Sequence, residues 1–270
     1  IVSDELNHAS IIDGCRLSKA ARAVYRHCDY AHLDEVLANA RKSGVKGKIL
    51  VVTDGVFSMD GDFADLKQVL SVCQKHDAIT MVDDAHATGV LGKGGRGTVD
   101  HCHVHDDWDI TIGTLSKAVG VMGGYFAGSR EVRDFLLAKA RPVLFSSSHP
   151  PAVIGAISAA FDVMTEEPQH HERLWSNTRF FKAGLKKLGF NTGNSTTPVT
   201  PVIIGNSAKA AEFSQKLFDN GVFAQGIYFP MVAEDKARLR TIVSASHTEA
   251  DLGDALAAFE KVGRQLGIVK

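Results

Sequence analysis

The sequence predicts an α/β protein in which a large domain with a mostly parallel sheet precedes a smaller α/β domain. Short apolar runs alternate with helical patterns along most of the 270 residues, and this alternation is typical of βαβ units. The apolar runs lack the strict polar/apolar alternation of a half-solvated sheet, which indicates strands buried on both faces. Near residue 165 the pattern changes to a long polar helix. We therefore place the large domain at residues 1–164 and the smaller one at 165–270.

The predicted elements of the large domain follow one another in strand and helix order. Apolar runs predict four strands, at residues 49–53, 79–82, 110–112 and 125–127. Residues 65–75 carry Leu66, Val69, Leu70 and Cys73 at helical spacing, which predicts a helix with one buried face. Further helices are expected at residues 130–139 and 152–164.

The smaller domain is expected to mix helices and strands in the same way. Helical patterns cover residues 170–188, 208–220 and 249–266. Apolar runs predict strands at residues 202–204, 222–224 and 239–244.

Composition excludes several classes of protein. Thirty Lys and Arg against thirty-one Asp and Glu leave a formal charge of −1, so the chain lacks the basic surface of a nucleic-acid-binding protein. No run approaches the about 18 apolar residues of a membrane span, and we expect no membrane partner. The four cysteines form no C-x-x-C pair, which favours a reducing, cytoplasmic location over a disulfide framework.

Two motifs have simpler explanations than the functions they suggest. Residues 92–97 superficially match a dinucleotide-binding fingerprint, but no strand directly precedes them and no helix is expected after them, so we interpret them as a flexible loop. Residues 101–107 hold three histidines, a cysteine and two aspartates. A structural zinc site usually takes two ligand pairs from separate segments, and no second pair is evident, so we predict a solvated loop and no metal.

Asp83-Asp84-Ala85-His86 stands where a buried strand is expected to end. Sites in open α/β sheets form at the carboxyl ends of strands, so a carboxylate and an imidazole three residues apart can face one crevice there. Taken alone, the run is equally well explained by an aspartate that caps a helix beside a surface histidine.

Lys117 follows the next strand and is surrounded by small residues. A lysine in a tight, partly apolar setting loses its proton more readily and can act as a nucleophilic amine. By itself such a lysine would be taken as a surface residue. A carboxylate, a histidine and a lysine at successive strand ends, however, are the groups that pyridoxal phosphate chemistry requires, and we favour that interpretation.

The chain resembles the α-oxoamine synthases, fold-type I pyridoxal phosphate enzymes that condense an amino acid with an acyl-CoA. The matching segments occur in family order over nearly the whole chain, at residues 4–14, 53–61, 83–89, 114–117, 145–148 and 238–241. The resemblance implies an aspartate aminotransferase-like large domain, a small C-terminal domain and pyridoxal 5'-phosphate as cofactor. Family members carry a further segment before these motifs, so we expect that the N-terminal part of the large domain is missing here.

The resemblance also implies a role for each matching residue. Lys117 would be the Schiff-base lysine and the base that removes the α-proton of the substrate. Asp83 would pair with the pyridine nitrogen, while His86, assisted by Ser58, would hydrogen-bond the phenolic oxygen. His8 would stack on the cofactor ring near the substrate, where the simpler alternative is a packed or capping histidine.

The remaining implied roles concern the phosphate and the substrate. Thr114 would bind the cofactor phosphate, and Ser146 and Ser147 would reach the phosphate of a neighbouring subunit, which implies a homodimer with shared active sites. Arg240 would hold the amino-acid carboxylate with two parallel hydrogen bonds. Arg238 is expected to be structural or exposed.

Among family members the motifs resemble glycine C-acetyltransferase most, on the evidence of residues 6–10 and 54–61. This resemblance implies that glycine and acetyl-CoA are condensed to 2-amino-3-ketobutyrate and CoA. Three alternatives remain open: condensation of alanine with a longer acyl thioester, as in 8-amino-7-oxononanoate synthase; an inactive cofactor-domain fragment; and a nicotinamide-dependent dehydrogenase built on residues 92–97.

Overall fold

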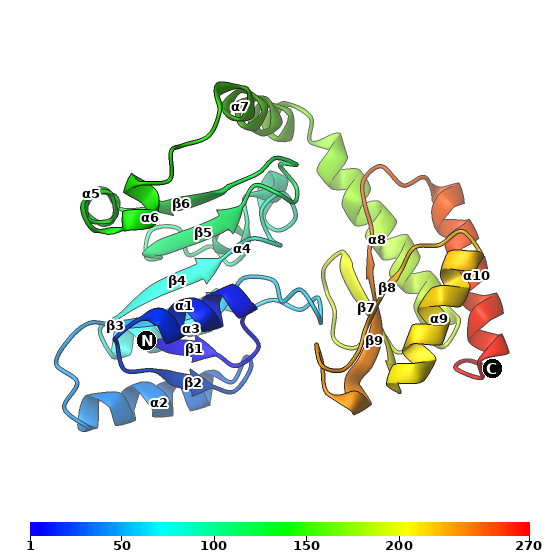
Figure 1. Cartoon of the computed structure of the whole chain (residues 1–270), viewed down its shortest axis with the longest axis horizontal. Coiled ribbons are helices and arrows are strands. Elements are labelled where there is room, and N and C mark those ends of the chain that lie inside the picture. The colour runs from blue at the N-terminus through cyan, green and yellow to red at the C-terminus, as the bar shows by residue number, and fades with distance from the viewer. The chain divides into compact units, whose positions relative to one another are not determined.

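The computed structural model describes residues 1–270 and divides into two compact units (Figure 1). The first contains Ile1–Phe57 and Phe63–Glu167, and the second contains Ser58–Asp62 and Pro168–Lys270. The second unit thus includes a short loop from the first half of the chain. The carbonyl of Gly61 in this loop accepts hydrogen bonds from the backbone N–H groups of Thr196 and Thr197. The predicted division at residue 165 falls inside a helix of the first unit.

The first unit is built on a six-stranded sheet with the order β2-β1-β3-β4-β5-β6. Four of its strand pairs are parallel, and only β5 and β6 pair in the antiparallel sense. The mostly parallel sheet confirms the predicted fold class. The strands are β1 (Val2–Asp4), β2 (Ala23–Tyr25), β3 (Ile49–Asp54), β4 (Ala78–Asp83), β5 (Ile110–Thr114) and β6 (Gly124–Gly128).

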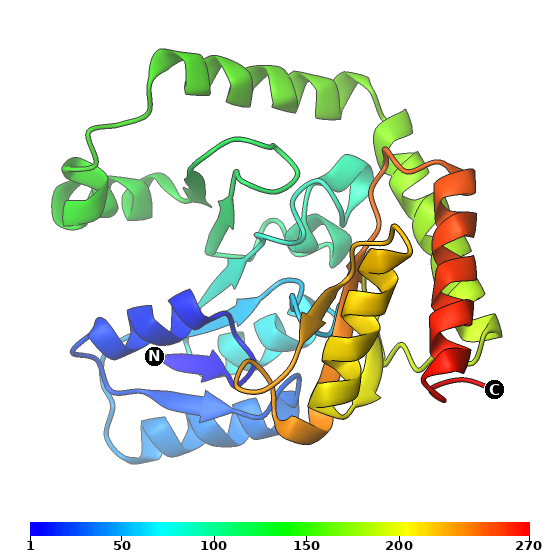
Figure 2. The same cartoon turned by 45° about the vertical axis from the view of Figure 1, so that its right-hand side comes forward.

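Seven helices complete this unit: α1 (Ala9–Leu17), α2 (Tyr30–Lys42), α3 (Leu66–Lys75), α4 (Thr98–His101), α5 (Arg130–Lys139), α6 (Arg141–Leu144) and α7 (Pro151–Glu166). One core cluster packs Leu33 and Leu37 of α2 against Val51 of β3 and Val69 of α3. By contrast, none of the residues of α5, α6 or α7, drawn in green in Figure 2, is buried. The length and apolar character needed to cross a membrane are not combined in any helix of the chain.

The second unit has a three-stranded antiparallel sheet with the order β7-β9-β8, and its helices lie on one face (Figure 1). The elements are α8 (Gln169–Lys187), β7 (Val199–Gly205), α9 (Ser207–Asp219), β8 (Gln225–Ile227), β9 (Ala237–Ile242) and α10 (Glu249–Gln265).

The predicted strand at residues 222–224 is wrong, because these residues still belong to the connection after α9. Gly221 adopts a left-handed φ of 82°, and the N–H of Val222 caps the helix on the carbonyl of Leu217. The chain pairs with β9 only from Gln225 onward.

The core of the second unit centres on Phe259, which is fully buried. Its ring lies edge-on to Phe181, Phe190 and Phe213, with centroids 5.5–6.0 Å apart. Such aromatic contacts add to the free energy gained by removing the ring from water. This cluster joins α8, α9 and α10.

Replacing Phe259 with alanine should therefore destabilise the second unit strongly. A buried Phe→Ala substitution leaves a cavity and costs about 3–5 kcal/mol. Urea denaturation followed by circular dichroism would measure the loss. The control is Phe223→Ala, since Phe223 is 79% exposed and its loss should change the unfolding free energy by about 0.5 kcal/mol or less. Equal effects of the two substitutions would contradict this packing.

Candidate active site

Three neighbouring parallel strands end in polar side chains at one edge of the first unit's sheet. Asp54 ends β3, Asp83 ends β4 and Thr114 ends β5. Asp54 and Asp83 are register partners, and the N–H of Gly55 donates to the carbonyl of Asp83 at 2.8 Å. Two carboxylates therefore lie side by side where open α/β sheets form their binding sites.

Asp54 holds the segment that carries His8. Its Oδ2 accepts the backbone N–H of His8 at 2.8 Å, and its own N–H donates to Oδ1 of Asn7 at 2.7 Å. The amide of Asn7 donates in turn to the carbonyl of Val52 at 2.9 Å. These bonds fix the turn between β1 and α1. His8 itself is exposed and caps α1, where its ring accepts the N–H of Ser10.

Burial and mutual repulsion shape the acidity of this edge. Burial first, and then the charge of Asp83, raise the pKa of Asp54 to about 7. Burial also raises the pKa of Asp83, opposed by the hydrogen bond from the N–H of Ala85 and by the positive charges of Lys117 and His8. The side chains of Lys117, His8 and Asp83 are therefore near enough to influence one another electrostatically.

Lys117 lies in a tight turn after β5. The turn is closed by the N–H of Gly120, which donates to the Lys117 carbonyl, and by the N–H of Leu115, which donates to that of Gly123. Gly120 and Gly123 have left-handed φ values of 76° and 116°, which glycine adopts without strain. The lysine side chain is exposed, so its amine is available to a ligand at the sheet edge.

Hydroxyl groups lie beside this turn. The Oγ1 of Thr114 and the Oγ of Ser116 are 2.7 Å apart, and the N–H of Ser116 also donates to Thr114 Oγ1. His86 is half-buried in the turn that follows β4. The structure thus brings His8, Asp83, Lys117 and Thr114 to one edge, with His86 three residues beyond Asp83.

The other predicted site residues lie elsewhere in the chain. Ser146 and Ser147 follow α6 and are exposed, and Ser147 has a φ of 62°. Ser58 belongs to the loop that groups with the second unit. Within that unit its carbonyl accepts Nη1 of Arg240 at 3.4 Å.

Two arginines of β9 differ in their hydrogen bonding. Arg238 is buried, forms an ion pair with Asp60 and donates to the carbonyls of Met59 and Lys236, so it is a structural residue, as predicted. Arg240 keeps a buried Nε without a hydrogen-bond partner. An unpaired buried donor is costly, so Arg240 retains hydrogen-bonding capacity for a ligand.

The glycine-rich residues 92–97, expected to be a flexible loop with no helix after them, have a defined local structure. They form a 3-10 turn followed by the one-turn helix α4. Asp84 is buried, and its Oδ2 accepts the N–H of Thr98 at 2.8 Å. A Cβ on Gly97 would lie 2.1 Å from that oxygen, and one on Gly55 would lie 2.3 Å from Oδ1. The glycines therefore let the backbone approach Asp84.

Three side chains of the histidine-rich residues 101–107 contact different neighbours. Cys102 is buried, His101 lies edge-on to Phe63 with ring centroids 4.9 Å apart, and His105 contacts Asp100 at 3.0 Å. These three side chains therefore pack against or bind different neighbours.

The raised pKa of Asp54 predicts a pH dependence of stability in the cofactor-free protein. Between about pH 4 and pH 7 the folded state holds a proton on Asp54 that the unfolded state has released, so stability should fall as the pH rises through this window, by the order of a few kcal/mol. Asp54→Asn keeps an oxygen acceptor for the N–H of His8 but removes the charge. We expect a flatter stability profile and a gain at pH 8, measured by urea unfolding at pH 5 and pH 8. The exposed Asp13→Asn is the control, and an unchanged slope in Asp54→Asn would contradict the assignment.

Sequence reasoning missed the residues that support this edge. Asp54, Asn7 and Asp84 are buried polar residues, and a single sequence does not reveal which acidic side chains will be buried. Thr88 and Tyr125 were also missed, although their hydroxyls lie 2.7 Å apart. The available signal for Asp54 was its place at the end of an apolar strand, the same signal that identified Asp83.

Comparison with known proteins identifies the family. Residues 1–259 match the family Aminotransferase class I and II. The chain is 56% identical over 270 residues to 8-amino-7-oxononanoate synthase of Thermoanaerobacter pseudethanolicus, covering all of this chain and 68% of that protein. It is 55% identical over 269 residues to the enzyme of the same name from Symbiobacterium thermophilum, with the same coverage.

A solved structure of a related enzyme has the same fold. Serine palmitoyltransferase from S. paucimobilis, with a bound PLP–myriocin aldimine, superposes with a TM-score of 0.94 at 32% identity and covers 99% of this chain and 67% of that one. The chain thus spans about two thirds of the length of these relatives.

The groups at the sheet edge fit the cofactor of this family. Lys117 supplies an amine, Asp83 a carboxylate that can pair with a protonated pyridine nitrogen, and Thr114 and Ser116 supply hydroxyls next to the amine. An amine, a carboxylate and phosphate-binding donors are what the protein must contribute to pyridoxal phosphate. The chain belongs to the class I and II aminotransferases of fold type I and, within them, to the α-oxoamine synthases, whose cofactor is pyridoxal 5'-phosphate.

Proposed function

We propose that this protein condenses L-alanine with pimeloyl-CoA to give 8-amino-7-oxononanoate, CoA and CO₂. The observation that carries the proposal is the name shared by relatives that are 50–56% identical to the whole chain, 8-amino-7-oxononanoate synthase. These relatives favour the alternative stated from the sequence over condensation of glycine with acetyl-CoA. The segments that suggested glycine, 6–10 and 54–61, include residues of the β1–α1 turn and of the end of β3.

The residues at the sheet edge support the proton transfers of such a reaction. Bound pyridoxal phosphate supplies an electron sink for the α-carbon of the amino acid. Lys117 accepts the α-proton on its Nζ, for which it must first be neutral. The carboxylate of Asp83 keeps the pyridine nitrogen protonated, and this charged pair fits a half-buried site where burial alone disfavours the carboxylate.

The other side chains position the reactants. His8, whose backbone N–H is held by Asp54, would contact the cofactor ring, and His86 and Ser58 would hydrogen-bond the phenolic oxygen. Thr114 binds the phosphate. Arg240, with its unpaired buried Nε, holds the amino-acid carboxylate until the new carbon–carbon bond has formed, the CoA thiolate has left and the carboxylate departs as CO₂.

A homodimer completes the proposal. The three helices without a buried residue expose large apolar side chains, among them Phe135, Leu144, Ile154 and Phe161, and Phe145 directly after α6 is exposed as well. Large exposed apolar side chains that gather on one surface are typical of an interface. A second copy would cover it and would bring Ser146 and Ser147 to the cofactor phosphate of its neighbour. Light scattering should therefore give twice the monomer mass.

A thiol-release assay tests the proposed reaction. The protein reconstituted with pyridoxal phosphate is given either alanine with pimeloyl-CoA or glycine with acetyl-CoA, and free CoA is measured. We expect turnover with alanine and pimeloyl-CoA and much slower release with the second pair. Equal or faster release with glycine and acetyl-CoA would overturn the substrate assignment, and no release with either pair would overturn the catalytic function.

A further inference from the structure

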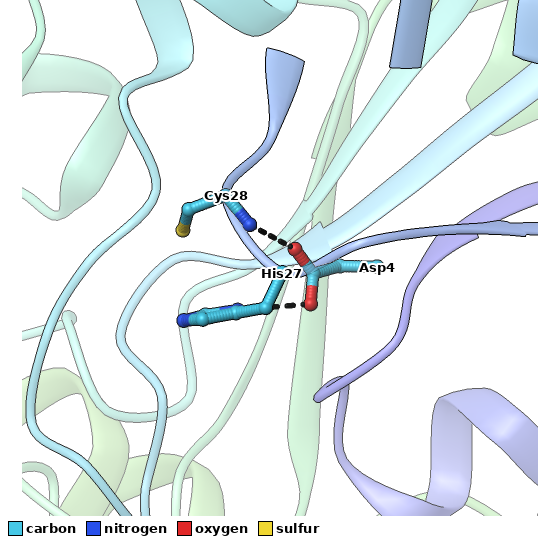
Figure 3. A group of neighbouring side chains, drawn as sticks. All are labelled: Asp4, His27 and Cys28. Carbon is cyan, nitrogen blue, oxygen red and sulfur yellow. Dashed lines mark hydrogen bonds and ion pairs between the residues drawn. The ribbon is translucent and has the colours of Figure 1, made fainter. Parts of the chain in front are cut away.

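A second group of chemically reactive side chains lies at the β1–β2 end of the first unit's sheet. It consists of Asp4 at the end of β1 with His27 and Cys28 in the connection between β2 and α2 (Figure 3). One carboxylate oxygen, one imidazole nitrogen and the sulfur all lie within 4.8 Å of one another. None of the predicted site residues belongs to this group.

The carboxylate of Asp4 is fixed in place by its surroundings. The residue is 1% exposed, its Oδ1 accepts the N–H of Leu6 at 2.9 Å, and its Oδ2 accepts the N–H of Cys28 at 3.0 Å. These two backbone bonds fix the orientation of the carboxylate. The carboxylate is therefore buried and held in one orientation, unlike the carboxylates of an exposed surface cluster.

The imidazole of His27 is oriented as well. Its Nδ1 lies 3.0 Å from Oδ1 of Asp4, and its ring stands edge-on to Phe57 with centroids 4.3 Å apart. Figure 3 shows the ring and the Cys28 amide each directed at one of the two carboxylate oxygens.

Cys28 occupies a backbone conformation that cysteine seldom adopts. Its φ is 51°, in the left-handed region where glycine, asparagine and aspartate are favoured. A residue with a Cβ is strained there, so the backbone does not explain why position 28 holds a cysteine. The hydroxyl of Tyr30, two residues further along the chain, accepts the N–H of Asp65 at 2.7 Å.

We propose that Asp4, His27 and Cys28 form a zinc-binding site, with water as the fourth ligand. A thiolate, an imidazole and a carboxylate are the three ligand types that zinc takes in proteins, at about 2.0–2.3 Å. His27 Nδ1 and Asp4 Oδ1 are already 3.0 Å apart. The zinc ion takes the place of the proton between these two atoms, and the Cys28 sulfur moves toward the ion.

The charges and protons of this step balance. The Cys28 thiol loses its proton to solvent on binding, and the neutral imidazole binds through Nδ1 while its proton resides on Nε2. One thiolate and one carboxylate then neutralise the two positive charges of the ion. Since a proton is released, the affinity for zinc should rise with pH.

Equilibrium dialysis of the pyridoxal phosphate-loaded protein against micromolar Zn²⁺ tests the site. We expect one tightly bound zinc per chain in the wild type and a loss of affinity of about 10–100-fold or more in Cys28→Ser. The matched control is Cys15→Ser, a half-buried cysteine of α1 outside the group, which should bind zinc normally. His27→Gln provides a second variant whose affinity should also fall, and circular dichroism verifies that each variant is folded.

Cobalt gives an independent readout of the sulfur ligand. Difference spectra of Co²⁺-loaded against metal-free protein should show a thiolate-to-metal charge-transfer band in the wild type and in Cys15→Ser but not in Cys28→Ser. Absence of bound zinc, or equal affinity in folded Cys28→Ser, would overturn the proposal and leave the group as a hydrogen-bonded connection between β1 and the β2–α2 segment. Neither readout depends on turnover.

Discussion

Lys117→Ala is expected to abolish turnover with alanine and pimeloyl-CoA. The variant loses both the amine that holds the cofactor and the base that accepts the α-proton. General acid–base catalysis alone contributes about 10²–10⁴-fold, and loss of covalent attachment adds to this. The exposed side chain of Lys117 makes no hydrogen bond that the fold needs, so the unfolding free energy should remain near that of the wild type. Initial rates of CoA release measure the effect.

A matched lysine variant separates this role from a general charge effect. Lys93 is also exposed and belongs to the same unit, and Lys93→Ala should retain nearly full activity. If Lys117→Ala kept a rate within tenfold of Lys93→Ala, Lys117 would not be the catalytic lysine.

Asp83→Asn is expected to give the second largest loss. Asparagine has the shape of aspartate, and its oxygen can still accept the N–H of Ala85 as Asp83 Oδ1 does at 2.9 Å, so the fold should be retained. It cannot keep a pyridine nitrogen protonated, because it carries no charge. Loss of one preorganised electrostatic contact to the reacting system costs about 10²–10³-fold in kcat.

The spectrum of the cofactor provides a second readout for Asp83. The visible absorption of bound pyridoxal phosphate should change its pH dependence in Asp83→Asn, whereas the exposed Asp106→Asn should leave both rate and spectrum unchanged. A normal rate in Asp83→Asn would remove Asp83 from the site.

The sequence was most informative where long apolar runs end in polar residues. Strands β3, β4 and β5 and helices α3, α5, α7 and α8 lie where the patterns predicted them, within a few residues. The sheet edge at Asp83 and Lys117 followed from the same patterns, because parallel strands bring their carboxyl ends together.

The first 48 residues were less informative. Strands β1 and β2 have three residues each, too few for hydrophobic periodicity to be recognised. The N–H of Asp54 donates to Asn7, which lies 47 positions earlier in the chain. The Ser58–Asp62 loop groups with the second unit through hydrogen bonds from Ser195 and Thr197 to the carbonyl of Gly61. Patterns within a short stretch of sequence do not predict which distant residues will contact one another.

The sequence motifs also could not identify the acyl substrate. The motifs lie around the cofactor, where the whole family needs the same groups. Chain length is sensed by the shape of a pocket, and one methylene changes discrimination by only about 1–3 kcal/mol. The names of the relatives favour the condensation of alanine over that of glycine, the two proposed from the sequence.

Borohydride reduction of the protein loaded with pyridoxal phosphate tests the central claim most directly. Reduction fixes the cofactor on the amine that holds it, and mass spectrometry of the peptides locates the label. The account predicts one label per chain on Lys117 and none in Lys117→Ala. A label on another lysine, or no stoichiometric label in the wild type, would contradict the assignment of the β5 turn as the cofactor site.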